Sequence, residues 1–228
     1  MTQKAAAFAK RRALSMGIPL RLLRELRMEA HLFAIRCNPL NRVNAGKLAA
    51  LSDIKLNLGP SSQTLPGWVN VDGWRGPGVD LVCDLRQRLP FTDGSCHLIF
   101  SEHVLEHIDL QFRARVLTEW RRLIAPNGRV RVVVPSSRRA TEAYARGDTQ
   151  WFIDALGVNS RNDGLNNIFN QHFHKYIDDF DSLSRDLRNS GFERVWESSC
   201  NGSDWPELRV DRPWRFREIV SLYVEAEP

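Results

Sequence analysis

Short apolar runs alternate with polar turns from residue 53 onward. Runs at 54–58, 68–71, 79–83 and 97–100 each end at a glycine, an aspartate or a serine, which is typical of buried strands closed by turns. A helical period follows over 111–124, with its apolar positions on one face. The pattern therefore predicts four strands and then a helix.

The second half continues the alternation less regularly. Residues 129–134, 192–196 and 219–224 are predicted strands, and 178–190 is a predicted helix that ends at a glycine. The stretch 136–172 is rich in arginine, asparagine, glycine and aromatic residues, and we expect irregular structure there. Strands that alternate with helices favour a mostly parallel sheet with both faces covered. We expect an α/β, Rossmann-like, doubly wound fold.

The first 50 residues have a different texture. Helical spacing between 20 and 35 predicts one or two amphipathic helices, broken near 17–19 and 38–39. We expect an N-terminal helical extension over 1–50 and one main domain over 51–228. Three roles for the extension stay open: a cap packed on the main domain, a peripheral membrane contact, or an arm that docks a partner or is partly disordered.

Charge divides the chain in the same way. The net charge is +5, but residues 1–50 carry ten basic and two acidic side chains, so the remainder is slightly acidic. A basic leader on an acidic body argues against nucleic acid as the partner of the body. No apolar run reaches the length of a membrane span, and the N-terminus lacks the apolar core of a signal peptide. We expect a cytoplasmic protein, either free or bound peripherally to the inner face of the membrane.

The residues that end the predicted strands carry candidate chemistry, because ligands of open α/β sheets bind beyond the carboxyl ends of the strands. Gly59 lets the backbone approach a ligand closely. Asp72 is suited to accept the hydroxyls of a ribose, although an Asx turn or a helix cap would also use it. Asp84 and Leu85 offer an acceptor and an apolar surface to an adenine. Together these strand ends indicate a ligand that contains adenosine.

At these residues the sequence resembles a known family. The segments LNLGPSSQTLPGWVNVDGWRGPGVDLVCDLRQRLPFTDGSCHLIFSEHVLEHI, LIAPNGRVRVVVPSSRRATEAYARGD and HKYIDDFDSLSRDLRNSGFERV are similar to class I S-adenosylmethionine-dependent methyltransferases. The resemblance covers about residues 53–200. It is strongest to short, bacterial-type, methyltransferase-11-like members, which often act in glycan or natural-product pathways. It implies strand order 3-2-1-4-5-7-6, a last strand that is antiparallel, and S-adenosylmethionine as the cofactor.

The resemblance also implies roles for single residues. The loop after the first strand would approach the methionine part of the cofactor, Asp72 would hold the ribose, and Asp84 with Leu85 would contact the adenine. The residues after the fourth strand would line the wall near the sulfonium. The complete expected cofactor set is Gly59, Pro60, Ser61, Asp72, Asp84, Leu85, Ser101, Glu102 and His103.

The chain departs from the family at the first of these loops. The usual glycine-rich loop is replaced by Gly59-Pro60-Ser61-Ser62, and only eight residues separate Gly59 from Trp68. That connection is too short for a full helix, which limits the usual contribution of a helix N-terminus to cofactor binding. These departures leave open a second class of function, a non-catalytic partner or regulatory module with an eroded cofactor loop.

Histidines are the candidate catalytic groups, because an alcohol acceptor needs a base or a metal to remove its proton. His103, Glu106 and His107 have the i, i+3, i+4 spacing of one helix face. With His174, this set resembles the metal site of certain metal-dependent O-methyltransferases. We expect His103 or His174 as a base and no metal. The alternatives are a metal held by all four residues, or a segment that only packs beneath the cofactor.

The predicted function is methyl transfer from S-adenosylmethionine to a small-molecule or glycan acceptor, at an oxygen. Aromatic residues after position 140 could form the wall of an acceptor pocket, but they would equally suit an ordinary hydrophobic core. The alternative of an RNA substrate is disfavoured by the acidic body. The aromatic candidates are Tyr144, Trp151, Phe152, Phe169, Phe173, Tyr176, Trp205 and Trp214.

Overall fold

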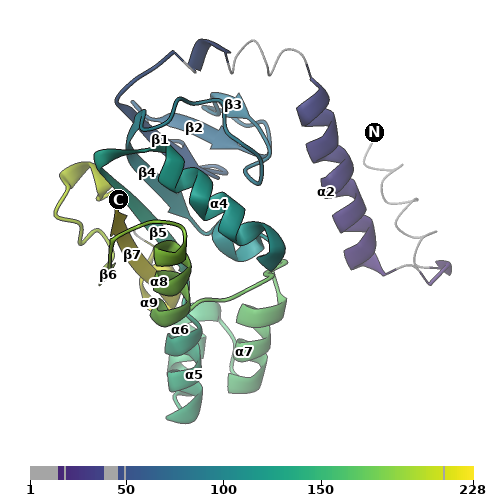
Figure 1. Ribbon diagram of the computed structural model, residues 1–228. Helices are drawn as coiled ribbons and strands as arrows, with labels where there is room; N and C mark the ends of the chain where they lie inside the picture. The colour runs from purple at the N-terminus through teal and green to yellow at the C-terminus, as the bar shows by residue number, and fades with distance from the viewer. Residues whose placement is uncertain (1–14, 18, 39–45, 49, 213) are drawn as a thin grey trace.

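The computed structural model describes residues 15–228 except 18, 39–45, 49 and 213. Its centre is a seven-stranded sheet in the order β3-β2-β1-β4-β5-β7-β6 (Figure 1). The strands are β1 (Ile54–Leu58), β2 (Val69–Asp72), β3 (Leu81–Val82), β4 (Cys96–Glu102), β5 (Ile124–Pro135), β6 (Arg194–Ser198) and β7 (Ser221–Glu227). The predicted strand order is confirmed.

Strand directions also agree with the prediction. The pairs from β3 to β5 are all parallel, and β7 runs antiparallel to both of its neighbours. Leu58 at the end of β1 is level with Val71 on one side and with Ser101 on the other. This register brings the carboxyl ends of β1, β2 and β4 to one edge of the sheet, where the candidate cofactor residues lie.

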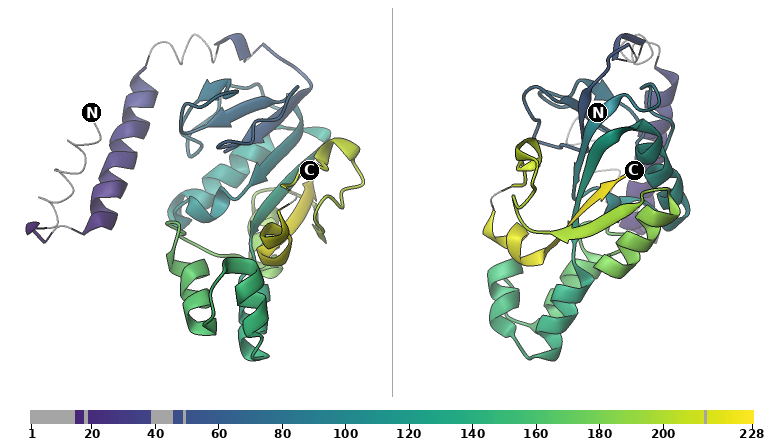
Figure 2. Two further views of the ribbon diagram at one scale, coloured as in Figure 1. Left: turned by 180° about the vertical axis from the view of Figure 1, so that it is seen from behind. Right: turned by 60° about the vertical axis from the view of Figure 1, so that its left-hand side comes forward.

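One face of the sheet is covered by the helices α4 (Leu110–Leu123) and α8 (Phe180–Asn189) (Figures 1 and 2). Val116, Leu117 and Trp120 of α4 pack with Leu183 of α8 on the apolar side chains of the central strands. The opposite face has a smaller core that includes Trp68, Leu98, Phe100, Val133, Leu208 and Tyr223. There, loop segments near 65–68 and 200–210 take the place of long helices.

The prediction of irregular structure over 136–172 is wrong. This stretch forms α5 (Ser137–Ala145), α6 (Thr149–Leu156) and α7 (Arg161–Asn170). Each helix begins after a polar cap whose side chain accepts a backbone N–H three residues on: Ser136, Asp148 and Ser160. Such caps satisfy orphan N–H groups and stabilise short helices despite a weak apolar period. With α9 (Arg215–Val220), these helices form a lobe below the sheet (Figure 1).

Two further predictions need correction. The expected strand at 219–224 begins only at Ser221, because 215–220 are helical and the carbonyl of Val220 accepts a hydrogen bond from Ser136 N. The expected helix face around His103 is not an α-helix, since His103 has a φ of 54° and only Leu105–His107 form a 3-10 turn, η1. A left-handed residue cannot continue a right-handed helix.

The N-terminal extension contributes α2 (Leu20–Cys37), which packs beside β3 (Figures 1 and 2). Leu32 and Ile35 contact Val82 and Val79 in a small separate cluster. Among the residues that the structure describes, none of the helices combines the length and the apolar composition that a membrane span requires. The expectations for residues 1–14 lie outside the described residues, and the division at residue 50 stays a prediction.

Candidate active site

The loop after β1 passes very close to the segment after β4. Gly59 has a φ of 69°, and a Cβ at this position would lie 2.2 Å from Val104 Cγ2. Only glycine fits such a backbone without strain or displacement. The glycine at this loop is therefore required by packing, whether or not a ligand binds. Ser61 also has a positive φ, of 52°, so this short loop is tightly bent.

Asp72 ends β2 and holds the same loop in place. One carboxylate oxygen accepts a hydrogen bond from Ser61 N at 2.8 Å, and the other accepts one from Trp74 N at 2.9 Å. The second contact is the Asx turn considered for this residue. Because an ionised carboxylate has about four lone-pair sites, acceptor capacity for two ribose hydroxyls remains.

Asp84 follows β3. Its carboxylate, which was expected to contact an adenine, is bonded to a side chain of the protein. Both of its oxygens accept hydrogen bonds from Arg86, at 3.0 and 3.1 Å, and Arg86 also forms a two-point ion pair with Glu29 of α2. Burial raises the pKa of Asp84, but the hydrogen bonds from Arg86 outweigh burial and the net pKa is lowered. Leu85 is partly buried against the main core. Asp84 thus links the sheet to the N-terminal helix.

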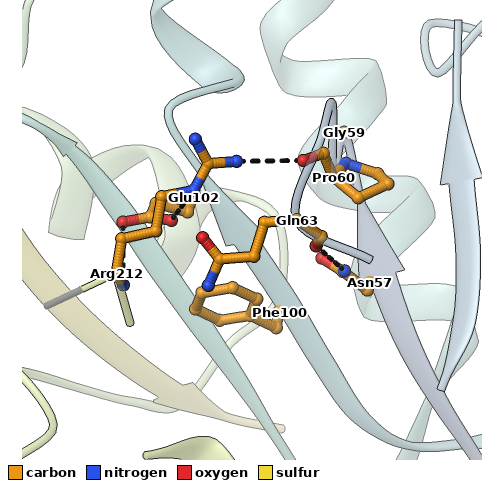
Figure 3. Close-up of a pocket in the computed structure, with 7 residues that line it drawn as sticks. All are labelled: Asn57, Gly59, Pro60, Gln63, Phe100, Glu102 and Arg212. Atoms are coloured by element: carbon orange, nitrogen blue, oxygen red, sulfur yellow. Dashed lines mark hydrogen bonds and ion pairs between the residues drawn. The ribbon is translucent and has the colours of Figure 1, made fainter. Parts of the chain in front are cut away.

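A small pocket lies between the β1 loop and the end of β4 (Figure 3). It is shallow and partly open to solvent, and it is lined by Asn57, Gly59, Pro60, Gln63, Phe100, Glu102 and Arg212. Burial raises the pKa of Glu102, while nearby arginines act against that shift. The neighbouring Ser101 is buried, and its hydroxyl has no hydrogen-bond partner.

His103 follows directly and is held on both ring nitrogens. Its Nδ1 lies 3.0 Å from Oε1 of Glu106, and its Nε2 lies 2.9 Å from the hydroxyl of Ser221 at the start of β7. A non-glycine residue with positive φ is uncommon and costs of order 1 kcal/mol or more. The surrounding contacts therefore fix this imidazole in an unfavourable backbone conformation at the end of β4.

Glu106 is fully buried, yet neither carboxylate oxygen makes a geometrically acceptable hydrogen bond. His103 Nδ1 is within ion-pair distance, and His107 Nε2 lies 3.9 Å away. Burial acts to raise the pKa of Glu106, but the two histidines outweigh burial, so the net pKa is lowered. An ionised, buried and incompletely satisfied carboxylate is costly, which marks this position as a candidate for chemistry.

His174 completes the cluster from a distant part of the chain. The backbone N–H groups of Lys175 and Tyr176 donate to the carbonyl of Glu106, which brings this loop beside η1. His174 Nδ1 lies 2.5 Å from the carbonyl of Ile168. A carbonyl can only accept, so Nδ1 carries the proton and Nε2 is a free acceptor in the neutral ring. Burial lowers the pKa of His174 and favours that neutral form.

The structure brings the expected histidine set together. Ligand atoms of Glu106, His107 and His174 lie within 4.8 Å of one another, and Nδ1 of His103 lies 3.0 Å from Oε1 of Glu106. Arg212 was missed at the sequence level, although its side chain crosses the pocket from the segment before α9 (Figure 3). No motif surrounds it, and its contact with Pro60 spans 152 residues, so no local pattern could reveal it.

Comparison with known proteins adds a family. The family described as methyltransferase domain matches residues 66–132, whereas no curated protein matches the chain. A possible histamine N-methyltransferase from Thermotoga maritima is 16% identical, with 90% of this chain and 96% of that chain covered and a TM-score of 0.48. An S-adenosylmethionine-dependent methyltransferase from Mesorhizobium loti is 15% identical, with 82% and 96% covered and a TM-score of 0.45.

The trans-methyltransferase CalH, solved with S-adenosylhomocysteine, is 12% identical, with 83% of this chain and 55% of that chain covered and a TM-score of 0.44. For three of the solved structures that it matches, the chain spans between 36% and 55% of their length. Likeness at this level carries no information on the acceptor. Residues 66–132 match a methyltransferase domain, and the order of the strands is the one that the resemblance to class I S-adenosylmethionine-dependent methyltransferases implies.

Proposed function

We propose that this protein transfers the methyl group of S-adenosylmethionine to an oxygen of a small-molecule or glycan acceptor. The observation that carries the proposal is the buried Glu106 next to His103, directly beside the pocket residue Glu102 at the end of β4. A histidine backed by a buried carboxylate is suited to remove a proton from an alcohol.

The cofactor fits the residues at the strand ends. Asp72 keeps free acceptor capacity for the ribose, and the pocket between Pro60 and Glu102 lies where the family places the methionine part. The adenine end fits less directly, because Asp84 is already bonded to Arg86. When bound, the cofactor supplies an electrophilic methyl group, and the protein has to align the acceptor and exclude water.

His103 is the proposed catalytic base. Because the carboxylate of Glu106 favours a proton on Nδ1, Nε2 is left as the acceptor, and the Ser221 hydroxyl now fills that position. An acceptor hydroxyl in its place would give its proton to Nε2 while its oxygen forms the new C–O bond. The C–S bond breaks with its electron pair left on sulfur, so the reaction balances without any further reagent. Glu106 is then a positioning residue.

A second mechanism uses a divalent cation in place of a base. Glu106, His107 and His174 support it, since Nε2 of His174 is free and its ring is fixed through Nδ1. Ligands of a tetrahedral zinc ion, at about 2.1 Å from the metal, lie about 3.4 Å apart. The observed spread of up to 4.8 Å would have to contract. We favour His103 as the base, because Glu106 already lies beside its Nδ1 and only the hydroxyl of Ser221 has to be replaced at its Nε2.

The acceptor is proposed to bind near the helical lobe. Tyr144, Phe169, Phe173 and Trp214 each expose more than a third of their surface there, and exposed aromatic rings are suited to stack on sugars or flat aglycones. Phe152, in contrast, is fully buried and belongs to the core of the lobe.

The N-terminal extension is proposed to contact a partner protein or the inner face of a membrane in the cytoplasm. Leu22, Leu26 and Phe33 of α2 are largely exposed, and apolar side chains on an otherwise basic segment favour such contacts. Co-sedimentation with anionic vesicles would test the membrane part, with a Leu26→Ser, Phe33→Ser double variant as the control.

The experiment that tests the proposed function is methyl transfer from isotopically labelled S-adenosylmethionine to a panel of hydroxylated aglycones, sugars and oligosaccharides. We expect labelled product and S-adenosylhomocysteine in equal amounts, with the label on oxygen. Cofactor binding without transfer to any acceptor class would favour the non-catalytic module, for which the packing roles of Gly59 and Asp72 provide support.

A further inference from the structure

One arginine beside the candidate base lacks hydrogen bonds to the part of the chain that the structure describes. The side chain of Arg217 in α9 makes none there, nor any ion pair, and its Nε is buried. Burial lowers the pKa of this guanidinium, while the charges of Glu102 and Glu106 act in the opposite direction. A guanidinium has five N–H donors, and a partly buried charge without a partner is costly. These donors are therefore available to a group that enters from outside.

The backbone places Arg217 on the side of the candidate base. The N–H of Ser221, the first residue of β7, donates to the carbonyl of Arg217, so the two residues lie one helical turn apart on the same face. The hydroxyl of Ser221 lies 2.9 Å from Nε2 of His103, the atom proposed to remove the proton of the acceptor. The charge of Arg217 also acts to lower the pKa of Glu102, the residue before His103, against the effect of burial. An acceptor hydroxyl at His103 would therefore have Arg217 as a neighbour.

Two exposed aromatic rings form a platform beside this guanidinium. Trp214 and Phe216 stack with 5.7 Å between their ring centroids and 29° between their planes, and they expose 48% and 38% of their surface. The guanidinium carbon of Arg217 lies 5.9 Å and 5.3 Å from the two centroids. Such contacts fix a guanidinium in place without using its N–H donors. A flat ligand that packs on these rings would lie beside the donors of Arg217.

The charges around the site favour a ligand group with one negative charge. Arg212 is paired with Glu102, with 3.2 Å between Nε and Oε2, and His103 lies beside Glu106. Arg217 has no such partner among the described residues. A carboxylate carries one charge and two oxygens that match two parallel N–H donors of an arginine. A phosphate monoester carries about −1.5 to −2 charges and would place excess negative charge near Glu102 and Glu106.

We propose that Arg217 selects the acceptor by binding a carboxylate that lies close to the hydroxyl to be methylated. Trp214 and Phe216 would pack on the flat part of the same molecule. The substrate class is then a hydroxylated aromatic carboxylate, in place of a neutral aglycone or sugar. The inference rests on the proposed function, because it assumes methyl transfer to an oxygen. Arg217 would determine specificity and take no part in the proton transfer to His103.

The test uses pairs of acceptors that differ in this charge alone. The acceptor panel would include 2-hydroxybenzoate with 2-hydroxybenzamide, and 3,4-dihydroxybenzoate with 3,4-dihydroxybenzamide. Labelled S-adenosylmethionine would give kcat and KM for the full chain as the wild type, Arg217→Gln and Arg217→Lys. Arg215→Gln is the matched control, since the side chain of Arg215 in the same helix is 82% exposed and forms a surface ion pair with Asp154.

We expect the wild type to use a carboxylate with a kcat/KM about 10- to 100-fold above that of its amide, the range for a hydrogen bond to a charged group. Arg217→Gln should remove most of that preference, mainly through a higher KM, because binding is lost and the base is kept. Arg217→Lys keeps the charge and should restore part of the preference, whereas Arg215→Gln should behave as the wild type. Thermal unfolding and calorimetry with S-adenosylhomocysteine would show that each variant is folded and binds the cofactor.

Three results would overturn the inference while the proposed function stands. Transfer to amides or other neutral acceptors as fast as to carboxylates would show that the charge is not selected. An unchanged preference for carboxylates in folded Arg217→Gln would remove Arg217 from the site. A methyl ester as the product, in place of an ether, would show that the carboxylate is itself the reacting group. Transfer to no acceptor of the whole panel would overturn the proposed function, and this inference with it.

Discussion

Two buried clusters of charge, one around Arg131 within β5 and one around Glu106 after β4, differ in how completely their hydrogen bonds are made. In the first, Arg131 of β5 uses its guanidinium nitrogens in five hydrogen bonds, to Asp211, Glu225, Ser198 and the carbonyl of Ser199. Five is the full donor capacity of arginine. This cluster ties the segment before α9 to the sheet and has no capacity left for a ligand.

In the second cluster, Glu106 is equally buried, but both of its oxygens lack a hydrogen-bond partner, and the histidines around it leave Nε2 of His174 free. Buried polar groups are paired in most of a folded protein, so an exception calls for an explanation. The comparison teaches that burial of charge alone does not identify a site. The incomplete hydrogen bonding of Glu106 identifies a candidate site, whereas the complete hydrogen bonding of Arg131 indicates a structural role.

The largest expected effect is on catalysis, at the cluster around Glu106. His103→Gln should lower kcat for an oxygen acceptor by about 10²- to 10⁴-fold, the usual contribution of a general base. The affinity for S-adenosylhomocysteine should fall much less than kcat, because the expected contact of His103 with the cofactor is that of a wall residue, whereas its proton transfer acts on the acceptor. Rate assays and calorimetry on the same preparation would measure both. Transfer at the wild-type rate would remove His103 from the mechanism.

Removal of the fully bonded arginine should act on stability. Arg131→Met leaves Asp211 buried without its cation and leaves Glu225 with Arg129 alone, so the free energy of unfolding should fall by about 3–5 kcal/mol. Urea unfolding would measure it. Arg194→Met, which breaks an exposed pair with Glu227, should cost less than about 1 kcal/mol. Similar losses in the two variants would contradict the structural role of Arg131.

A smaller, pH-dependent effect is expected for Glu106. Its pKa is lowered in the folded protein from the usual 4.5, so its ionised form stabilises the fold above about that pH. The contribution is lost as the pH falls through the folded-state pKa. The difference in free energy of unfolding between the wild type and Glu106→Gln should therefore stay constant from pH 7 to about pH 4.5 and shift against the wild type below that pH in urea unfolding.

The exposed Glu142, which pairs with Arg138 on the surface, provides the control for that series. The difference in the free energy of unfolding between the wild type and Glu142→Gln should stay small across the same pH range, because an exposed ion pair contributes little. If the difference in the free energy of unfolding between the wild type and Glu106→Gln does not change with pH, this would contradict the view that the buried carboxylate is ionised at neutral pH.

The smallest expected effect concerns the metal alternative. With His103 as the base, treatment with a chelator should change the rate by less than about twofold. His107 is half-exposed and takes no part in the contact between His103 and Glu106. His107→Gln should therefore also have little effect on the rate. Loss of activity on chelation that is restored by zinc, magnesium or manganese would instead favour a cation held by Glu106, His107 and His174.

The sequence predicted the sheet better than the lobe. β4 contains a continuous apolar run before its final polar residues, as burial on both faces of a sheet produces, and β1 alternates apolar with polar residues before Gly59. The helices α5, α6 and α7 are short, and their existence depends on polar caps such as Asp148, whose meaning is clear only with the helix in view. Periodicity alone therefore missed them.

The same limit applies to the site. The ends of strands identified Asp72 and Glu102 because topology places such residues at one edge. The partners of these residues come from elsewhere: Arg212 reaches the β1 loop from the far end of the chain, and Glu29 of α2 reaches Arg86. Contacts at such separation leave no local signal. The role of Asp84 at the adenine stays a prediction for the same reason.

The most direct test of the central claim is calorimetric titration of the purified chain with S-adenosylmethionine and S-adenosylhomocysteine, with Asp72→Asn as the site variant. Asparagine keeps the shape of the side chain but can accept only one of the two hydrogen bonds that Ser61 N and Trp74 N donate to Asp72, so thermal unfolding has to show that the variant is folded. Asp93→Asn at the surface is the control. We predict one site per chain, weakened at least about tenfold by Asp72→Asn alone. No binding of either ligand by the folded wild type would contradict the account.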